Sequence, residues 1–109
     1  MHKLMVVFKS SDDSLTLETQ WSTEFVARAE RMPGLRRVSV SRIVGGPGDS
    51  IDLHLVHELY FDDLDSLKKA LASDQGQEAG RALMAFGGEN VGVYFAQHLE
   101  EDRPALPLH

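Results

Sequence analysis

Four short apolar segments, each bounded by turn residues, predict four β-strands at 3–9, 37–44, 51–61 and 91–98. The first is rich in valine, as is typical of a buried strand. In the other three, apolar and polar residues alternate with a period of two, which indicates strands that bury one face. In the third, this alternation assigns five apolar residues to the core face: Ile51, Leu53, Leu55, Leu59 and Phe61.

Apolar residues at helical spacing predict helices after the first and third strands. The first helix is expected to begin at the N-cap Thr16 and to end before Pro33-Gly34, with an apolar stripe of Leu17, Trp21, Phe25 and Met32. The second helical region is expected in two pieces, which Asp63 and Ser73 cap and Gly87-Gly88 ends. The order βαββαβ predicts an α+β ferredoxin-like fold, an antiparallel four-stranded sheet with the helices on one face.

The length of 109 residues fits one domain, expected at 1–98, with residues 99–109 as a C-terminal tail that contains two prolines. The predicted sheet has a second face that no helix covers. Its occupants are expected to include Val56, Tyr60, Tyr94 and Ala96. Because so much apolar area is unfavourable in water, we expect a homodimer that closes as a dimeric α/β barrel.

Composition excludes several classes of partner and site. Lys and Arg number 11 and Asp and Glu 17, for a net charge of −6, and no basic cluster is visible, so we expect neither a nucleic-acid nor a membrane partner. The chain has no cysteine and hence no disulfide or thiolate metal site. We expect no metal and no cofactor. The N-terminus does not resemble a signal peptide, and a cytoplasmic location is expected.

The third strand carries the residues best suited to catalysis. Alternation places His54, Glu58 and Tyr60 on the barrel-facing side. Together they suit proton abstraction next to a carbonyl, with Glu58 or His54 as the base and Tyr60 as the hydrogen-bond donor. His54 and Glu58 are about 13 Å apart along a strand, so only cross-strand partners could bring them together. Alternatively, Glu58 pairs with an Arg or Lys across the dimer interface.

The first helix offers candidate ligand-binding residues. Trp21 and Phe25 are either core residues or the lining of a cleft between helix and sheet. Arg28 lies beside their stripe, where it either extends its charged end to solvent or binds an anion at a pocket mouth. Tyr94, on the barrel-facing side of the last strand, is the fourth candidate. His57 points the other way, among leucines, and is expected to be a hydrogen-bonded core or edge residue and not a ligand.

Three segments resemble the EthD family of the dimeric α/β-barrel superfamily, over roughly residues 2–98. They are KLMVVFKS at the start, Trp21 with MPGLRR at 32–37, and HELYFDDLDSLKKALASDQG at 57–76. The family typically shows Glu-Leu-Trp-Phe-Asp in the third segment. Its helix usually carries Trp, three residues, His and then a Pro-Leu pair. Here Phe25 stands where that His is expected, and Ala27 and Arg28 replace the Pro and Leu.

The resemblance implies a dimeric barrel and an association with ether-degradation gene clusters. We expect a small hydrophobic or carbonyl-containing ligand. One alternative is a cofactor-independent isomerase or monooxygenase that uses Glu58 and His54. Another is a haem-degrading monooxygenase, which Phe25 disfavours because a phenyl ring cannot ligate iron or move protons. A third is a non-catalytic accessory protein.

Overall fold

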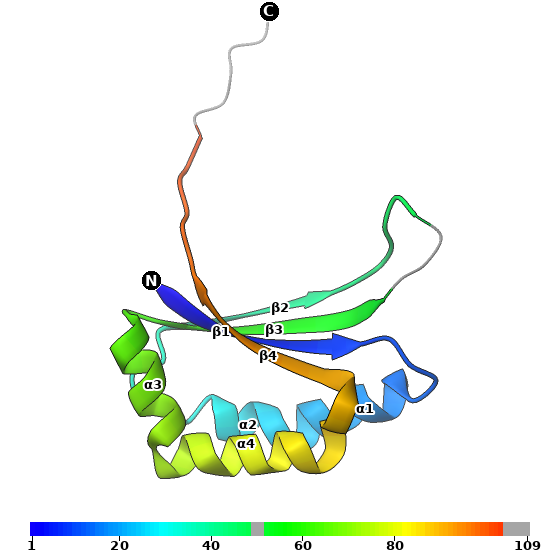
Figure 1. Ribbon diagram of the computed structural model, residues 1–109, viewed down its shortest axis with the longest axis horizontal. Coiled ribbons are helices and arrows are strands. Elements are labelled where there is room, and N and C mark those ends of the chain that lie inside the picture. The colour runs from blue at the N-terminus through cyan, green and yellow to red at the C-terminus, as the bar shows by residue number, and fades with distance from the viewer. Residues whose placement is uncertain (49–51, 104–109) are drawn as a thin grey trace, which may run out of the picture.

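The computed structural model describes residues 1–48 and 52–103, and it shows an antiparallel sheet with helices on one face (Figure 1). The sheet contains four strands: β1 (His2–Lys9), β2 (Arg37–Arg42), β3 (Leu53–Phe61) and β4 (Val91–Gln97). Their order is β2-β3-β1-β4. This is the α+β ferredoxin-like arrangement that the alternation of strands and helices predicts.

The helical segments follow β1 and β3, as the apolar spacing predicts. They are α1 (Ser14–Gln20), a π-helical turn (Trp21–Phe25), α2 (Val26–Ala29), α3 (Leu64–Ala72), α4 (Asp74–Gly87) and a 3-10 turn (Gly88–Asn90). Both predicted caps of the second region are confirmed. The Asp63 carboxylate accepts a hydrogen bond from the Ser66 amide at 2.7 Å, and the Ser73 hydroxyl accepts one from the Gly76 amide at 3.1 Å.

The first helical region differs from the prediction at its start and in its middle. Thr16 is not the N-cap, because α1 already begins at Ser14. The Ser14 hydroxyl there accepts a hydrogen bond from the Ser11 amide at 3.0 Å, which stabilises the preceding turn. The predicted single helix is also interrupted by the π-helical turn. In such a turn each backbone hydrogen bond spans one residue more than in an α-helix.

The core lies between the sheet and the helices. Leu4, Val6 and Phe8 of β1 face this layer, and β3 contributes Leu55, His57, Leu59 and Phe61. The predicted helical stripe supplies Leu17, Phe25 and Met32, all buried. The assignment of Leu53 to the core is wrong, since it is exposed at the first residue of β3. The expected core residue Ile51 lies outside the described residues.

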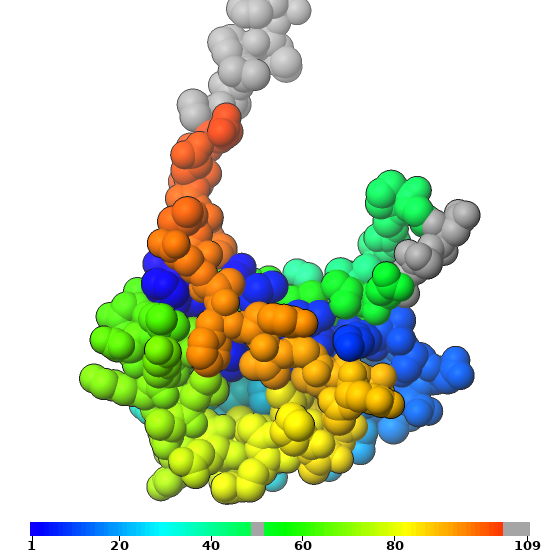
Figure 2. Space-filling view, in the orientation of Figure 1, coloured from blue at the N-terminus to red at the C-terminus, as the bar shows by residue number. Residues whose placement is uncertain are grey.

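The other face of the sheet, which we call the open face, has no helix over it. Two segments extend from the body on this side, the one that follows β2 and the one that follows β4 (Figure 1). Figure 2 shows the space between them. Strand β2 ends at Arg42, two residues before the predicted end, and Val44 is exposed. Within the described part of the chain, no helix combines the length and hydrophobicity needed to traverse a bilayer.

Candidate functional site

The sheet divides the candidate residues between its two faces. Glu58, Tyr60 and Tyr94 lie on the open face. In β3, Glu58 pairs with Met5 and Tyr60 with Lys3 of β1, and in β4, Tyr94 pairs with the same Met5. Trp21 and Phe25 belong to the π-helical turn on the opposite face. Residues of the two groups therefore do not line one common pocket within the described chain.

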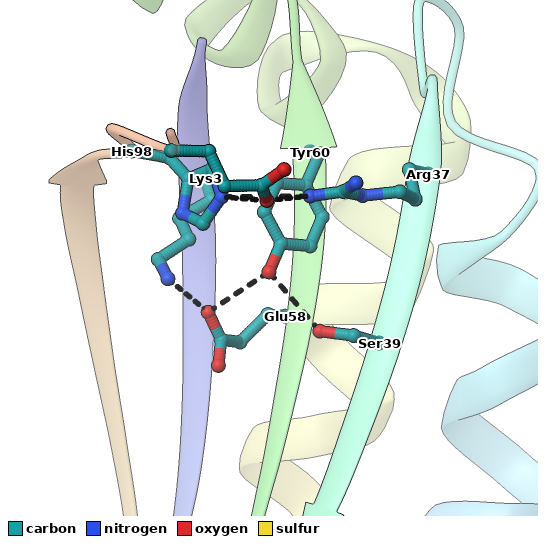
Figure 3. A network of polar contacts seen from close by, with 7 residues as sticks. Lys3, Arg37, Ser39, Glu58, Tyr60 and His98 are labelled. Atoms are coloured by element: carbon teal, nitrogen blue, oxygen red, sulfur yellow. Dashed lines mark hydrogen bonds and ion pairs between the residues drawn. The ribbon is translucent and has the colours of Figure 1, made fainter. Parts of the chain in front are cut away.

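A network of polar side chains occupies one end of the open face (Figure 3). We call it the open-face network; it consists of Lys3, Arg37, Ser39, Glu58, Tyr60 and His98. Antiparallel pairing explains the grouping, since Lys3 and Arg37 lie directly opposite Tyr60, and Ser39 opposite Glu58. The Tyr60 hydroxyl donates to Glu58 Oε2 at 3.3 Å and lies 3.2 Å from Ser39 Oγ.

Glu58 is held by a cation of its own chain. The Lys3 ammonium forms an ion pair with Glu58 Oε2, and both side chains are only 15% exposed. The alternative in which Glu58 depends on an Arg or Lys across a dimer interface is therefore not needed to keep this carboxylate paired. A half-buried carboxylate between an ammonium and a phenol is arranged to accept a proton or to fix a polar ligand.

Tyr60 is not one of the residues that a partner must cover, which corrects the sequence analysis. Its side chain is only 4% exposed within the single chain. The Arg37 guanidinium lies 4.4 Å from the centre of its ring, and the His98 imidazole packs edge-on at 4.8 Å. The missing signal was non-local, because the side chains that cover the ring come from β2 and from the residue that follows β4.

The residues after β4 are fixed to the network by Glu100. Its carboxylate accepts from Arg37 Nη2 at 2.8 Å and lies 2.7 Å from His98 Nε2. These contacts, that of His98 first and that of Arg37 second, lower the pKa of Glu100 to about 2. The described start of the tail is therefore attached to the edge of the open face by charge.

His54 does not join Glu58, which corrects its predicted place on the barrel-facing side. The β1–β3 register shifts from Phe8 opposite Leu55 to Lys9 opposite Leu53, so His54 is the extra residue of a β-bulge. Its Nε2 lies 2.8 Å from Glu18 of α1. Hydrogen bonds from Arg42 first and His54 second lower the pKa of Glu18. Alternation fails here because a bulge redirects the side chain.

On the helix side, Trp21, Phe25 and His57 form an aromatic group that we call the His57 cluster. His57 is fully buried, and its Nδ1 accepts a hydrogen bond from the Trp21 indole N–H at 3.0 Å. The Trp21 and Phe25 rings stand nearly perpendicular to the imidazole, with centroids at 5.4 and 5.7 Å. The expectation of a hydrogen-bonded core histidine is confirmed. Burial lowers the pKa of His57 to about 4, so the ring is neutral at pH 7.

An apolar cavity of about 120 Å³ lies beside this cluster, between the sheet and the helices. Its lining includes Val6, Phe25, Met32, Leu83 and Val93, and its other members are also apolar or glycine. Sequence reasoning placed Phe25 on such a cleft as one of two possibilities. It did not identify His57 as part of the same region, although His57 was recognisable as the polar member of an otherwise apolar strand face.

The two remaining candidates lie away from this cavity. Arg28 is half-buried, and its guanidinium donates to the Glu24 carbonyl within the same helical region, so it supports the backbone next to the π-helical turn. Tyr94 lies opposite Met5 on the open face and is 56% exposed. The roles of Tyr94 and Arg28 in ligand binding stay predictions. Across residues 1–48 and 52–103, no three His, Asp or Glu side chains are grouped to hold a metal ion.

One antiparallel sheet with helices on one face and an open second face is the ferredoxin-like fold. Several solved structures share this fold. A crystal structure of an ethyl tert-butyl ether d (EthD) family protein from Bacillus halodurans superposes with a TM-score of 0.85 at 28% identity, covering 91% of this chain and 99% of that one. The chain is therefore EthD-like, as the three sequence segments predict. No family model matches the chain.

More distant similarities extend to dimeric proteins and to an enzyme. A dimeric protein of unknown function and ferredoxin-like fold from Bacteroides fragilis has a TM-score of 0.61 at 22% identity, over 89% of this chain and 95% of that one. An antibiotic biosynthesis monooxygenase has a TM-score of 0.59 at 15% identity, over 92% and 100% of the two chains. Both likenesses concern the fold.

One curated sequence is also similar. It is an uncharacterized 11.0 kDa protein in the thcB-thcC intergenic region of Rhodococcus erythropolis, 21% identical over 95 residues. The match covers 87% of this chain and 92% of that protein.

Proposed function

We propose that this EthD-like chain acts as a homodimer in which each subunit binds a small hydrophobic molecule between its sheet and its helices. The observation that carries the proposal is the apolar cavity of about 120 Å³ in that layer. Protein interiors are normally packed without voids larger than a water molecule, so a cavity of this size forfeits dispersion contacts. A ligand of matching shape restores them.

The size and lining of the cavity favour a ligand of about six carbon atoms. An engineered cavity of about 150 Å³ lined by Leu, Ile and Phe binds benzene and excludes water. The present cavity is slightly smaller and has Phe25, Leu71 and Met84 in its wall. Met84 is largely exposed, which places the cavity next to the protein surface. An ionic ligand is disfavoured because no charged side chain is present to pair with it in this lining.

Filling the cavity tests the proposal. Gly80 lines the cavity, and a Cβ at this position meets no other atom within 4 Å, so Gly80→Leu introduces a side chain into the empty space. We expect cyclohexane to bind the wild-type chain in a ligand-observed NMR titration and to lose at least tenfold in affinity for Gly80→Leu. Ala85→Leu, on the exposed side of the same helix, is the matched control and retains binding. Equal binding by both variants contradicts the proposal.

The homodimer rests on the open face. Met5, Val7 and Val56 are only half-buried there, and Tyr94 is exposed beside them. The described starts of the two extending segments stand on the same side, with space between them (Figure 2). A second copy that packs on this face removes the apolar area from water, and the dimeric description of a structural relative supports this.

A second candidate function is acid–base chemistry at the open-face network. The specific observation in its favour is the Glu58 carboxylate, which receives a hydrogen bond from Tyr60 while Lys3 holds it in place. In a closed barrel, Glu58 is then the base that removes a proton next to a carbonyl, and the Tyr60 O–H turns from Glu58 to donate its hydrogen bond to the enolate oxygen. Such a role belongs to a cofactor-independent isomerase or monooxygenase.

Proton abstraction can be measured without knowledge of the natural substrate. Deuterium exchange of the α-protons of cyclohexanone in D₂O reports it directly by NMR. We expect faster exchange with the wild-type dimer than with Glu58→Gln, which preserves the shape of the side chain. Glu78→Gln, the same change at an exposed position of α4, serves as the control. Equal exchange rates for wild type and Glu58→Gln contradict this second candidate.

A further inference from the structure

His57 presents a buried hydrogen-bond donor that lacks an acceptor. The indole N–H of Trp21 can only donate, so the Nδ1 atom that it contacts must be the unprotonated nitrogen of a neutral ring. The proton of the imidazole is therefore on Nε2. This atom is buried and has no hydrogen-bond partner among residues 1–48 and 52–103. Buried donors are nearly always paired in folded proteins, so an unpaired one needs an explanation.

The cavity and the imidazole are neighbours through two shared residues. Val6 lies directly opposite His57 in the β1–β3 ladder and also lines the cavity. Phe25 lines the cavity too, and its ring packs perpendicular to the imidazole at 5.7 Å. His57 itself is not part of the cavity wall, and Val6 and Phe25 are the two residues that border both the imidazole and the cavity.

Phe25 stands where the backbone is least regular. It is the last residue of the π-helical turn, at the junction with α2. Such turns are rare, and they frequently occur at functional sites.

We propose that the cavity ligand carries a carbonyl group, and that its oxygen accepts the free hydrogen bond of His57 Nε2–H after the Phe25 ring moves aside. The proposal rests on ligand binding in the cavity and adds the chemical class and the orientation of the ligand. The hydrocarbon part fills the apolar space, and the oxygen satisfies the donor. A ketone fits because it accepts hydrogen bonds and has no hydroxyl of its own to leave unpaired.

Trp21 acts in this arrangement as a positioning residue. Its hydrogen bond to Nδ1 fixes the tautomer, which keeps the donor on the nitrogen available to the ligand. The neutral state of the imidazole also explains why a ligand with a neutral acceptor is favoured over a carboxylic acid. The neutral imidazole and the apolar lining offer no positive charge to compensate a buried carboxylate.

The test compares cyclohexane with cyclohexanone on the full chain at pH 7. We expect His57→Phe to weaken cyclohexanone binding about tenfold or more and to change cyclohexane binding less than twofold, since only the ketone uses the donor. In wild-type protein labelled with ¹⁵N, cyclohexanone shifts the Nε2 resonance of His57 and cyclohexane does not. This second measurement is independent of whether the variant folds.

The outcomes separate the two proposals. If cyclohexane binds but cyclohexanone leaves the His57 resonance in place, or if His57→Phe changes both affinities equally, the carbonyl assignment is overturned while hydrophobic binding stands. If neither compound binds, both proposals are overturned. A further expectation concerns Phe25→Ala, which removes the ring that is proposed to move aside: it binds cyclohexanone more tightly than the wild type, and weaker binding counts against the proposed movement.

Discussion

At the scale of single residues, His57 shows how burial converts an ordinary titratable group into a fixed hydrogen-bonding element. Its imidazole is 0% exposed and packs between the rings of Trp21 and Phe25. Desolvation disfavours the imidazolium ion, so the pKa falls from the usual 6.5 to about 4. The same burial that keeps the ring neutral must therefore make stability depend on pH.

The pH dependence has a defined sign and range. Between pH 6.5 and about 4, the unfolded chain binds a proton at His57 that the folded chain does not bind. The free energy of unfolding therefore falls as the pH is lowered through this range, by up to about 3 kcal/mol, because each pKa unit is worth about 1.4 kcal/mol. Above pH 6.5 His57 makes no pH-dependent contribution. Urea denaturation at several pH values measures the effect.

His57→Phe is the variant that isolates this contribution. We expect its free energy of unfolding to fall less than that of the wild type between pH 6.5 and 4, since the remaining groups titrate alike in both proteins. Trp21 is the single tryptophan of the chain, so its fluorescence follows unfolding in both. Identical pH profiles for the two proteins show that His57 is protonated as readily in the folded as in the unfolded chain.

Several residue assignments could be made from the sequence, and others could not. Period-two alternation assigned His57 to the core and Glu58 to the opposite face, because neighbouring side chains in a strand point to opposite faces of the sheet. It could not show that Tyr60 is covered by Arg37 and His98. Those contacts depend on which strands become neighbours, and alternation within one strand contains no information about that.

At the scale of elements, the junction of α3 and α4 shows a close approach that only glycine permits. Gly76 lies three residues after the cap Ser73, and a Cβ at this position would stand 2.7 Å from the Leu71 Cα atom. Real Cβ atoms do not approach backbone atoms so closely, and the backbone of α3 cannot move without disturbing the buried Leu67 and Ala70. The break between the two helices is therefore sterically defined.

Two alanine substitutions in α4 test this steric account. Gly76→Ala is expected to lower the free energy of unfolding by about 2 kcal/mol or more, because the new methyl group displaces backbone. Gly80→Ala, in the same helix but with nothing within 4 Å of the new Cβ, is expected to raise it by up to about 1 kcal/mol through helix propensity. Thermal or urea unfolding measures both. Equal effects of the two substitutions contradict the steric account.

The elements that sequence analysis located well are those with local signals. Asp63 and Ser73 were recognisable as caps because a side-chain acceptor three residues before a free amide is a local feature. The π-helical turn at Trp21–Phe25 and the bulge at His54 were not. Each inserts one residue relative to a regular repeat. The sequence shows no break in its apolar pattern at either insertion, so the pattern does not reveal it.

At the scale of the whole molecule, the two faces of the sheet differ in what they contain. The helix side contains the apolar cavity and the His57 cluster, and the open side contains the open-face network. The order of the strands, which brings β1 between β3 and β4, makes both possible: Val6 faces the cavity while Lys3 faces Glu58. In the proposed homodimer, only the open side depends on a second copy to exclude water.

The second copy on the open face can be detected from the mass of the protein in solution. Size-exclusion chromatography with light scattering is expected to give twice the chain mass of 12.1 kDa for the wild type.

Val56 pairs with Val7 in the centre of the open face, so Val56→Lys introduces a charge there in both subunits. Because the two ammonium groups would lose their hydration and repel each other in a closed barrel, we expect this variant to be a folded monomer. Leu15→Lys, on the 81% exposed side chain of α1, is the matched control and stays dimeric. A wild-type mass of one chain, or an unchanged dimer in Val56→Lys, shows instead that the open face is solvated and that Glu58 and Tyr60 work in contact with water.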